Sequence, residues 1–299
     1  MPAGAKLIRR VFAIAITLAL LAWLLIDRRF LAVGDAASRL QVGTLLLALA
    51  GLLASYATRA LRIRAEFGPL PGRFVDVLRV MLVHNAWVNV LPFRAGELAF
   101  PLLMRQHFNV ATERALASLL WLRMQDACVL ALLAVLALPA VPLSLRAALA
   151  AAVLLTAAGL RFAAKSRGPL PFGWLQRLRS SLSAATGSPW QTWLWTLLNW
   201  AIKMAALTLL LGALLPAPST IALAGALGAE VAAVLPVQGV AGFGTYEAGA
   251  AAMLAPAGVP LQAALPAALL MHLVVIASAV LAGLWAWATL PGGASARES

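Results

Sequence analysis

Long apolar runs separated by short polar breaks occupy almost the whole chain. Each run covers about 18–25 residues, a length at which an α-helix crosses a hydrocarbon core of about 30 Å. The runs are continuous, unlike the alternation over about ten residues that is typical of a membrane β-barrel. The pattern therefore predicts an all-α polytopic integral membrane protein with about six spanning helices, at 8–26, 40–61, 111–138, 144–161, 190–212 and 260–289.

Two further apolar stretches, at about 74–108 and 218–256, are each interrupted by a segment that starts with Leu-Pro and ends on a glutamate. These segments are Leu91–Glu97 and Leu235–Glu247. Proline removes a backbone donor and glycine relaxes the backbone, so both segments are expected to break a helix. Broken helices at matching places in two halves of a membrane protein point to a transport site.

The basic residues set the expected orientation, because short cytoplasmic loops carry an excess of Lys and Arg. If each broken stretch enters and leaves on one face, fourteen of the 23 basic residues lie on the same side of the membrane: Lys6, Arg9, Arg10, Arg59, Arg62, Arg64, Arg73, Arg79, Arg161, Lys165, Arg167, Arg177, Arg179 and Arg297. Four lie on the other side: Arg28, Arg29, Arg39 and Arg146. This predicts cytoplasmic termini and two oppositely oriented re-entrant helical hairpins, an inverted repeat of span, hairpin and span. The alternative is two full helices in each broken stretch, without symmetry.

We expect a single membrane domain over residues 1–299. Its first half covers about 8–161 and its second half about 190–289, joined by a basic cytoplasmic connector at 162–189 and followed by a short polar tail at 290–299. Charged residues, and no small-residue cleavage site, follow the first apolar run, so we expect a retained helix there and no signal peptide.

Composition agrees with this class and excludes others. Hydrophobic residues make up 63% of the chain and charged residues 11%, whereas the apolar share of soluble domains is nearer one half. The net charge of +13 is spread over helix ends and loops, without a basic patch interleaved with aromatics, so nucleic acid is not an expected partner. One cysteine, Cys128, and three scattered histidines predict no disulfide framework, no metal site and no cofactor.

Ionisable residues at membrane depth cost roughly 2.5–3.5 kcal/mol, so each is expected to face a partner or a wet cavity. In the first half, Arg94, Gly96 and Glu97 lie in the break, and a half-helix starting near Gly96 would present its amides to an anion. Arg123 and Asp126 share one helical face, and we expect Arg123 to pair with Glu97 or with substrate phosphate. A purely structural network of these charges is the alternative.

In the second half, Gly242 and Gly244 permit close backbone approach just before Glu247. His272 follows Glu247 by 25 residues, and the equivalent spacing from acid to base in the first half is 26. The similar spacing supports the predicted repeat. We consider Gly242, Gly244 and Glu247 candidates for substrate binding and His272 a candidate for coupling transport to protons.

Two more residues are candidates for proton coupling. Glu230 has no basic neighbour in sequence and is expected to be protonated if it is buried alone. Lys203 is the only lysine at membrane depth, and an acidic partner such as Glu230 or Glu247 is expected for it.

Four tryptophans nearby predict an interfacial belt: Trp190, Trp193, Trp195 and Trp200. No Ser-His-acid set, metal pair or nucleotide-binding segment is present in the sequence, so no catalytic residue and no enzyme activity are expected.

The segments Asn89–Glu97, Arg123–Asp126 and Pro236–Glu247, in this order, resemble the lysylphosphatidylglycerol synthase transmembrane-region family, also described as flippase-like. The resemblance spans about residues 8–289. It implies movement of a polar or anionic lipid between the leaflets of a bacterial inner membrane, with membrane lipids as partners. The fuller synthases carry a cytosolic aminoacyl-transfer domain, which this sequence does not contain up to Ser299, so lipid aminoacylation is not expected.

Two other functions remain open at this point. One is an accessory membrane protein that presents a lipid intermediate, as in hopanoid or phospholipid modification, to a separate lipid-biosynthetic enzyme. The other is an intramembrane enzyme that modifies lipids with Glu97 or Glu247 as acid and base. The sequence makes no prediction about the oligomeric state.

Overall fold

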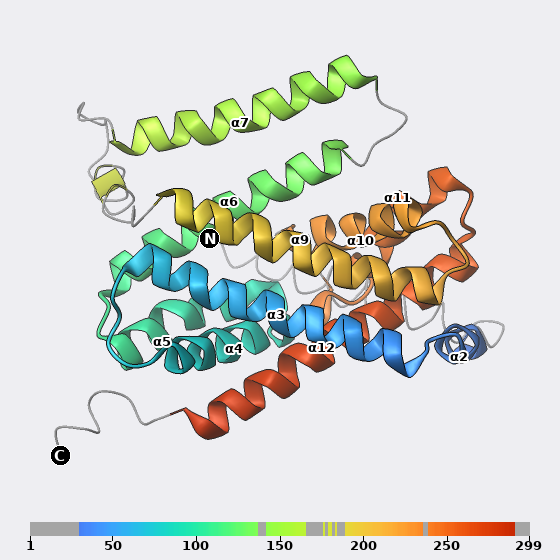
Figure 1. The fold of residues 1–299 in the computed structure, drawn as a ribbon, viewed down its shortest axis with the longest axis horizontal. Coiled ribbons are helices and arrows are strands. Elements are labelled where there is room, and N and C mark those ends of the chain that lie inside the picture. The colour runs from blue at the N-terminus through green and yellow to red at the C-terminus, as the bar shows by residue number, and fades with distance from the viewer. Residues whose placement is uncertain are drawn as a thin grey trace, which may run out of the picture. The chain divides into compact units, whose positions relative to one another are not determined.

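The computed structural model describes residues 30–136, 142–165, 189–235 and 239–290, and the single positions 176, 179, 180 and 183. The predicted helix at 8–26, most of the connector at 162–189 and the tail beyond residue 290 lie outside these residues. In the part of the chain that the structure describes, every regular element is helical (Figure 1).

The N-terminal elements are α2 (Phe30–Ser38), α3 (Val42–Phe67), α4 (Phe74–Val90), the 3-10 helix η2 (Pro92–Leu98), α5 (Ala99–Phe108), α6 (Thr112–Leu136) and α7 (Leu143–Lys165). The C-terminal elements are α9 (Pro189–Leu214), α10 (Ser219–Val234), η3 (Val240–Gly242), α11 (Thr245–Leu254), η4 (Ala255–Ala257) and α12 (Leu261–Thr289). Both predicted breaks are present, because a non-α segment separates α4 from α5 and α10 from α11.

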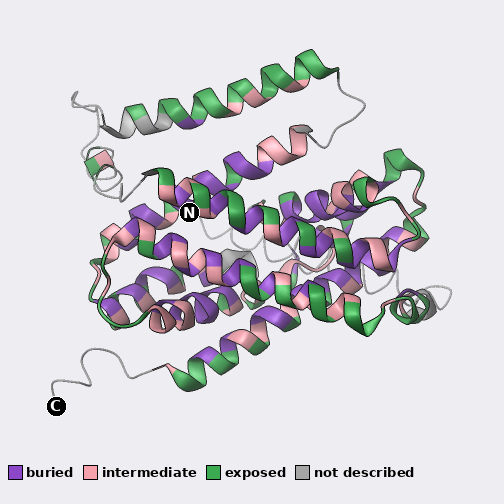
Figure 2. Ribbon diagram, viewed as in Figure 1, coloured by how far each residue is buried: buried purple, intermediate pink, exposed green. Residues whose placement is uncertain are grey.

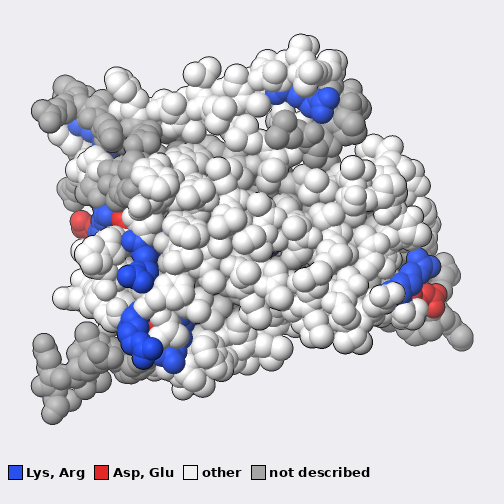
Figure 3. All heavy atoms as spheres, in the orientation of Figure 1, with Lys and Arg blue, Asp and Glu red and all other residues white. Residues whose placement is uncertain are grey.

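Four of these helices, α3, α6, α9 and α12, are long and apolar enough to cross a membrane. The protein is therefore an all-α polytopic membrane protein, as predicted. On the face drawn in Figure 3, charged side chains are sparse on the described surface. Along Leu143–Gly159 of α7, Ala157 is buried and the other side chains are half-buried or exposed (Figure 2). Such apolar exposure suits contact with lipid acyl chains.

The order and lengths of the helices repeat along the chain. Helices α3, α4, α5 and α6 contain 26, 17, 10 and 25 residues, and α9, α10, α11 and α12 contain 26, 16, 10 and 29. Each set is a long helix, a broken pair and another long helix. The opposite orientation of the two sets in the membrane stays a prediction.

The chain folds into two compact units, each assembled from separate segments of both predicted halves. The first unit contains the described residues 30–53, 85–96, 201–235 and 239–282. The second unit contains residues 54–84, 97–136, 142–165, 189–200 and 283–290. Helices α3, α4, α9 and α12 therefore contribute residues to both units.

In the first unit, glycines let the arms of the broken stretches pack closely. A Cβ atom on Gly96 would overlap the main chain of Trp87 and Val88, so the chain after the first break turns back against the end of α4. In the second break, α10 packs along α11, where Gly228 lies against the main chain of Gly249. Helices α10 and α11 thus form a helical hairpin, and re-entry of the two broken stretches from opposite faces of the membrane stays a prediction.

The second unit has a core shared by α3, α4, α5 and α6. Phe100, which is 1% exposed, lies at its centre. Its ring contacts His84 on α4 at 5.3 Å and Phe67 on α3 at 6.4 Å between ring centroids. This core fixes α5 beside the charged residues of α3 and α6.

Candidate functional site

A polar stripe runs along the otherwise apolar helix α3. Ser55, Arg59, Arg62 and Glu66 follow one another at intervals of four, three and four residues, which places them on one helical face. Ser55, Arg62 and Glu66 are buried and Arg59 is half-buried, whereas Arg64, on another face, is exposed. Helix α3 continues to Phe67, six residues beyond the predicted end, because these polar groups find partners inside the protein.

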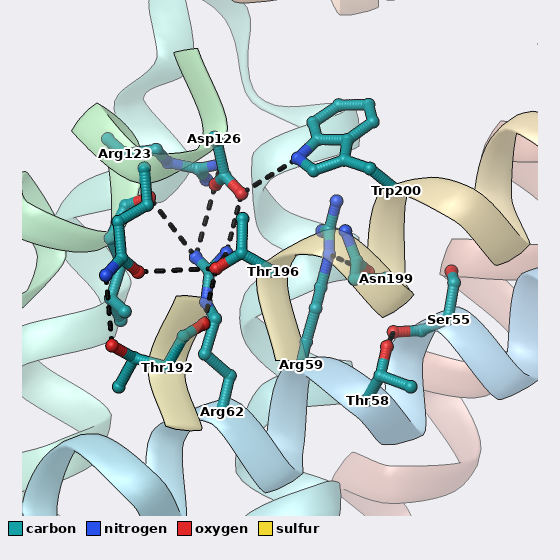
Figure 4. Close-up of polar contacts among 12 residues, drawn as sticks. Ser55, Thr58, Arg59, Arg62, Arg123, Asp126, Thr192, Thr196, Asn199 and Trp200 are labelled. Atoms are coloured by element: carbon teal, nitrogen blue, oxygen red, sulfur yellow. Dashed lines mark hydrogen bonds and ion pairs between the residues drawn. The ribbon is translucent and has the colours of Figure 1, made fainter. Parts of the chain in front are cut away.

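Arg62 forms a buried two-point ion pair with Asp126 of α6. Its Nη1 lies 2.6 Å from Oδ1 and its Nη2 lies 3.2 Å from Oδ2 (Figure 4). Nη1 also donates to Thr196 Oγ1 at 3.1 Å, and the indole Nε1 of Trp200 donates to Asp126 Oδ1 at 3.0 Å. This ion pair corrects the sequence-based interpretation of Arg62 as a loop cation and of Trp200, which is 2% exposed, as part of an interfacial belt.

Arg123 forms a second ion pair, with Glu97 at the end of the first break. Its Nη2 lies 2.7 Å from Oε1 and its Nε lies 3.1 Å from Oε2 of Glu97. Its remaining Nη1 lies 3.4 Å from Oδ2 of Asp126. The predicted pairing of Arg123 with Glu97 and its neighbourhood to Asp126 are confirmed.

Neutral side chains of α9 complete this region. Thr192, Thr196 and Asn199 lie at intervals of four and three residues on one face of α9. Asn199 Oδ1 accepts from Arg59 Nε at 3.2 Å, and Thr192 Oγ1 accepts from Gln125 Nε2 at 3.0 Å (Figure 4). We call Arg59, Arg62, Glu97, Arg123 and Asp126 the arginine cluster. Its five described members carry three positive and two negative formal charges.

A small pocket opens beside the arginine cluster. Its lining includes four charged side chains, those of Arg59, Arg62, Arg123 and Asp126. The rest of the lining is largely apolar and comprises Ile63, Met81, His84, Phe100, Leu119 and Leu122. The cavity holds about 30 Å³, which is room for about two water molecules. Its chemistry suits an anionic group that is attached to an apolar body.

The first unit contains a second charged region. His272 Nδ1 of α12 lies 2.7 Å from Glu247 Oε1, and the other carboxylate oxygen of Glu247 accepts from the backbone N–H of Gly244 at 2.6 Å. Gly242 and Gly244 have φ angles of +83° and +85°, values that favour glycine. A Cβ atom on Gly242 would press on the imidazole ring of His272, so the predicted close backbone approach is confirmed.

Lys203 and Glu230 form a buried ion pair in the same unit, at 2.5 Å between Nζ and Oε2. Tyr246 donates its hydroxyl to Glu230 Oε1 at 3.2 Å, and its ring stacks on His272 at 4.2 Å. The expected acidic partner of Lys203 is confirmed as Glu230. The premise that Glu230 lacks a basic neighbour is wrong, because the lysine reaches it from another helix. We call Lys203, Glu230, Tyr246, Glu247 and His272 the histidine cluster.

The two breaks produce the same kind of contact. Glu97 pairs with Arg123, 26 residues later, and Glu247 pairs with His272, 25 residues later, each with a shortest N–O distance of 2.7 Å. Glu97 lies in the first break and Glu247 just after the second, and the nitrogen-bearing partner lies on the next long helix in both cases. The similar spacing in sequence thus corresponds to a similar contact in the structure, between a carboxylate and a basic side chain.

The structure places some predicted site residues differently from the expectation. The side chain of Arg94 lies outside the described residues. Gly96 serves the hairpin turn, and α5 begins at Ala99 after a 3-10 turn, so no α-helix starts at Gly96. Sequence reasoning missed Arg59 and Arg62 as site residues, although their spacing on the polar stripe of α3 was a signal.

The chain belongs to the lysylphosphatidylglycerol synthase transmembrane-region family, since the family described as Lysylphosphatidylglycerol synthase TM region matches residues 10–283 of the 299. Comparison with curated proteins and with solved structures gave no match. Membership confirms the predicted family resemblance and links this membrane protein to lipid modification or lipid transport.

Proposed function

We propose that this member of the family moves an anionic lipid between the leaflets of a bacterial inner membrane without changing the lipid chemically. Both termini would lie in the cytoplasm, as the distribution of basic residues indicates. The observation that carries the proposal is the pocket whose lining combines three arginines with apolar side chains.

The charged side chains of the pocket lining suit a lipid phosphate. Guanidinium groups bind phosphate through two parallel hydrogen bonds, and Arg59, Arg62 and Arg123 all line the pocket. Among the described members of the arginine cluster, positive charge exceeds negative charge by one. An added anion would balance this excess in a region where unbalanced charge is costly.

The apolar side chains of the pocket lining suit the part of a lipid next to its head group. Met81, Phe100 and Leu122 offer contact to the glycerol and the first acyl carbons, while the tails stay in the bilayer.

The second part of the proposal is coupling to protons through the histidine cluster. The imidazole Nδ1 of His272 lies 2.7 Å from Glu247 Oε1, which is within the hydrogen-bond reach that proton transfer requires. Lys203 and Glu230 join the same region through Tyr246. The repeated order of helices supports an inverted repeat in which each hairpin faces one side of the membrane.

The test is lipid movement in liposomes that contain the purified chain. Fluorescent phosphatidylglycerol or phosphatidylcholine is added, and dithionite removes the signal of the outer leaflet. We expect wild type to move the anionic lipid, and Arg59→Ala and Arg123→Ala to slow it about tenfold or more, since each loses a charged hydrogen bond. Arg64→Ala, an exposed cation on the same helix as Arg59, is the matched control and should keep the wild-type rate.

Other outcomes would overturn the proposal. No movement of any lipid by folded wild-type protein would favour the accessory role of presenting a lipid to a separate enzyme. A changed lipid species in the extract would favour an intramembrane enzyme. Equal rates for Arg59→Ala and Arg64→Ala would remove the pocket from the transport path.

A further inference from the structure

We propose that Glu97 is an internal anion that occupies the place of the head group on Arg123, and that an entering head group displaces Glu97 together with the first turn of helix α5. This inference rests on the proposed function. It adds a residue that decides which lipids are accepted and an element that moves when they bind.

The geometry of the ion pair between Glu97 and Arg123 supports the idea that Glu97 occupies the place of a head group. Glu97 approaches the side of the Arg123 guanidinium through two contacts, of 2.7 Å to Nη2 and 3.1 Å to Nε. Two phosphate oxygens would use the same two donors in the same arrangement. The carboxylate therefore takes up the donors that a phosphate needs.

The other carboxylate of the arginine cluster is a poor candidate for displacement. Asp126 accepts hydrogen bonds from Arg62, Arg123 and Trp200, and its side chain is 6% exposed. The side chains of Glu97 and Arg123 are 16% and 27% exposed. The pair between Glu97 and Arg123 is thus the more accessible of the two.

The size of the pocket indicates that part of α5 must move before a head group can enter. A cavity of about 30 Å³ has room for about two water molecules, and a phosphodiester head group is larger than that. Phe100 fills part of the space between the pocket and the core, in ring contact with His84. Because Glu97 and Phe100 are three residues apart, movement of one short segment removes both from the site.

The first turn of α5 is the part that the displacement moves. The C-terminus of this ten-residue helix is closed by backbone hydrogen bonds from Asn109 to Arg105 and from Val110 to Met104. The N-terminus at Leu98 has no side-chain cap and continues from the 3-10 helix that carries Glu97. Exchange of one anion for another at Arg123 therefore acts on the first turn and leaves the C-terminal turn in place.

The displacement has a consequence for specificity. A head group must replace a carboxylate that is already in place, and only a ligand that itself bears negative charge does so without leaving Arg123 unpaired. Neutral head groups without a phosphate are therefore rejected more strongly than the pocket alone would reject them.

The first experiment is binding of dihexanoyl phosphatidylglycerol to the purified full chain in detergent, measured by thermophoresis. Glu97→Gln should bind the probe roughly fivefold tighter or more than wild type, the lower range for coupled binding events. Glu113→Gln removes the same charge at an exposed position of α6 and should bind like wild type. Dihexanoylglycerol, which has no phosphate, should show no gain with either variant.

A second measurement guards against a variant that folds poorly. Hydrogen exchange of Ala99–Phe108 in wild type should rise when dihexanoyl phosphatidylglycerol binds, because the first turn of α5 is released. Protection of α5 by the probe, or equal or weaker binding by Glu97→Gln, would overturn the inference. If Arg123→Ala abolishes binding while Glu97→Gln changes nothing, this inference fails and the proposed function stands. If Arg123→Ala binds as well as wild type, both fail.

Discussion

Trp200 and Arg62 donate to the same carboxylate oxygen of Asp126, at 3.0 Å and 2.6 Å. The other oxygen of Asp126 lies 3.2 Å from Arg62 Nη2 and 3.4 Å from Arg123 Nη1. One carboxylate thereby connects residues of α3, α6 and α9 within the second unit, and its loss has a predictable cost.

Asp126→Asn keeps the shape of the side chain and removes the charge that two arginines share. We expect the free energy of unfolding to fall by about 3–5 kcal/mol, as for other buried ion pairs that lose one partner. Thermal unfolding in detergent measures the change. Glu113→Gln on the same helix is the control, and an equal loss in both variants would contradict the hub role of Asp126.

Trp200→Phe removes the indole donor and keeps most of the ring. The carboxylate then lacks one hydrogen bond in a buried site, which should cost about 1–3 kcal/mol of unfolding free energy. Trp190→Phe, at an exposed position of the same helix, should change stability by much less. Thermal unfolding monitored by circular dichroism compares the two variants. Similar unfolding curves would show that Trp200 stabilises the protein only through the volume of its ring and not through its hydrogen bond.

Gly96→Ala tests the turn of the first hairpin. Its Cβ atom would overlap the main chain of Trp87 and Val88, so we expect a loss of roughly 1–3 kcal/mol as the arms separate. Gly159→Ala on α7 meets no atom within 4 Å and should stabilise its helix by up to about 1 kcal/mol. Opposite signs in thermal unfolding are the expected result, whereas two stabilising substitutions would argue against the close approach.

Lys203→Met and Glu230→Gln test the buried pair of the histidine cluster. Each single variant leaves a buried group without its partner and should lower stability by about 3–5 kcal/mol. The double variant should lose clearly less than the sum, because residues in contact are not additive. A strictly additive result from thermal unfolding would mean that the pair contributes no coupling.

Contacts of charged residues inside apolar helices could be predicted from the sequence where few residues of opposite charge were available. Arg123 lies deep in an apolar helix, so Glu97 was a natural partner for it, and Lys203 needed an acid for the same reason. The two broken stretches were predictable because proline and glycine act locally, on their own backbone.

Other contacts depend on which helix faces which, and sequence alone does not state that. Arg62 lies near the end of α3, where a cation usually marks a cytoplasmic loop, and its burial depends on Asp126 reaching it from α6. Trp200 belongs to a run of tryptophans, and its position on the helix face that carries Thr196 and Asn199 decided its role. The order and spacing of polar residues on α3 and α9 were visible, but their pairing required the fold.

The position of Arg123 along helix α6 indicates how deep in the membrane the pocket lies. Arg114 lies in its first turn and Arg123 nine positions further on, and at about 1.5 Å per residue these positions span about 14 Å. Half of a hydrocarbon core of about 30 Å is about 15 Å. If the first turn of α6 marks one membrane surface, Arg123 lies close to the middle of the bilayer. For the proposed movement of a lipid head group, this position is about equally far from both leaflets.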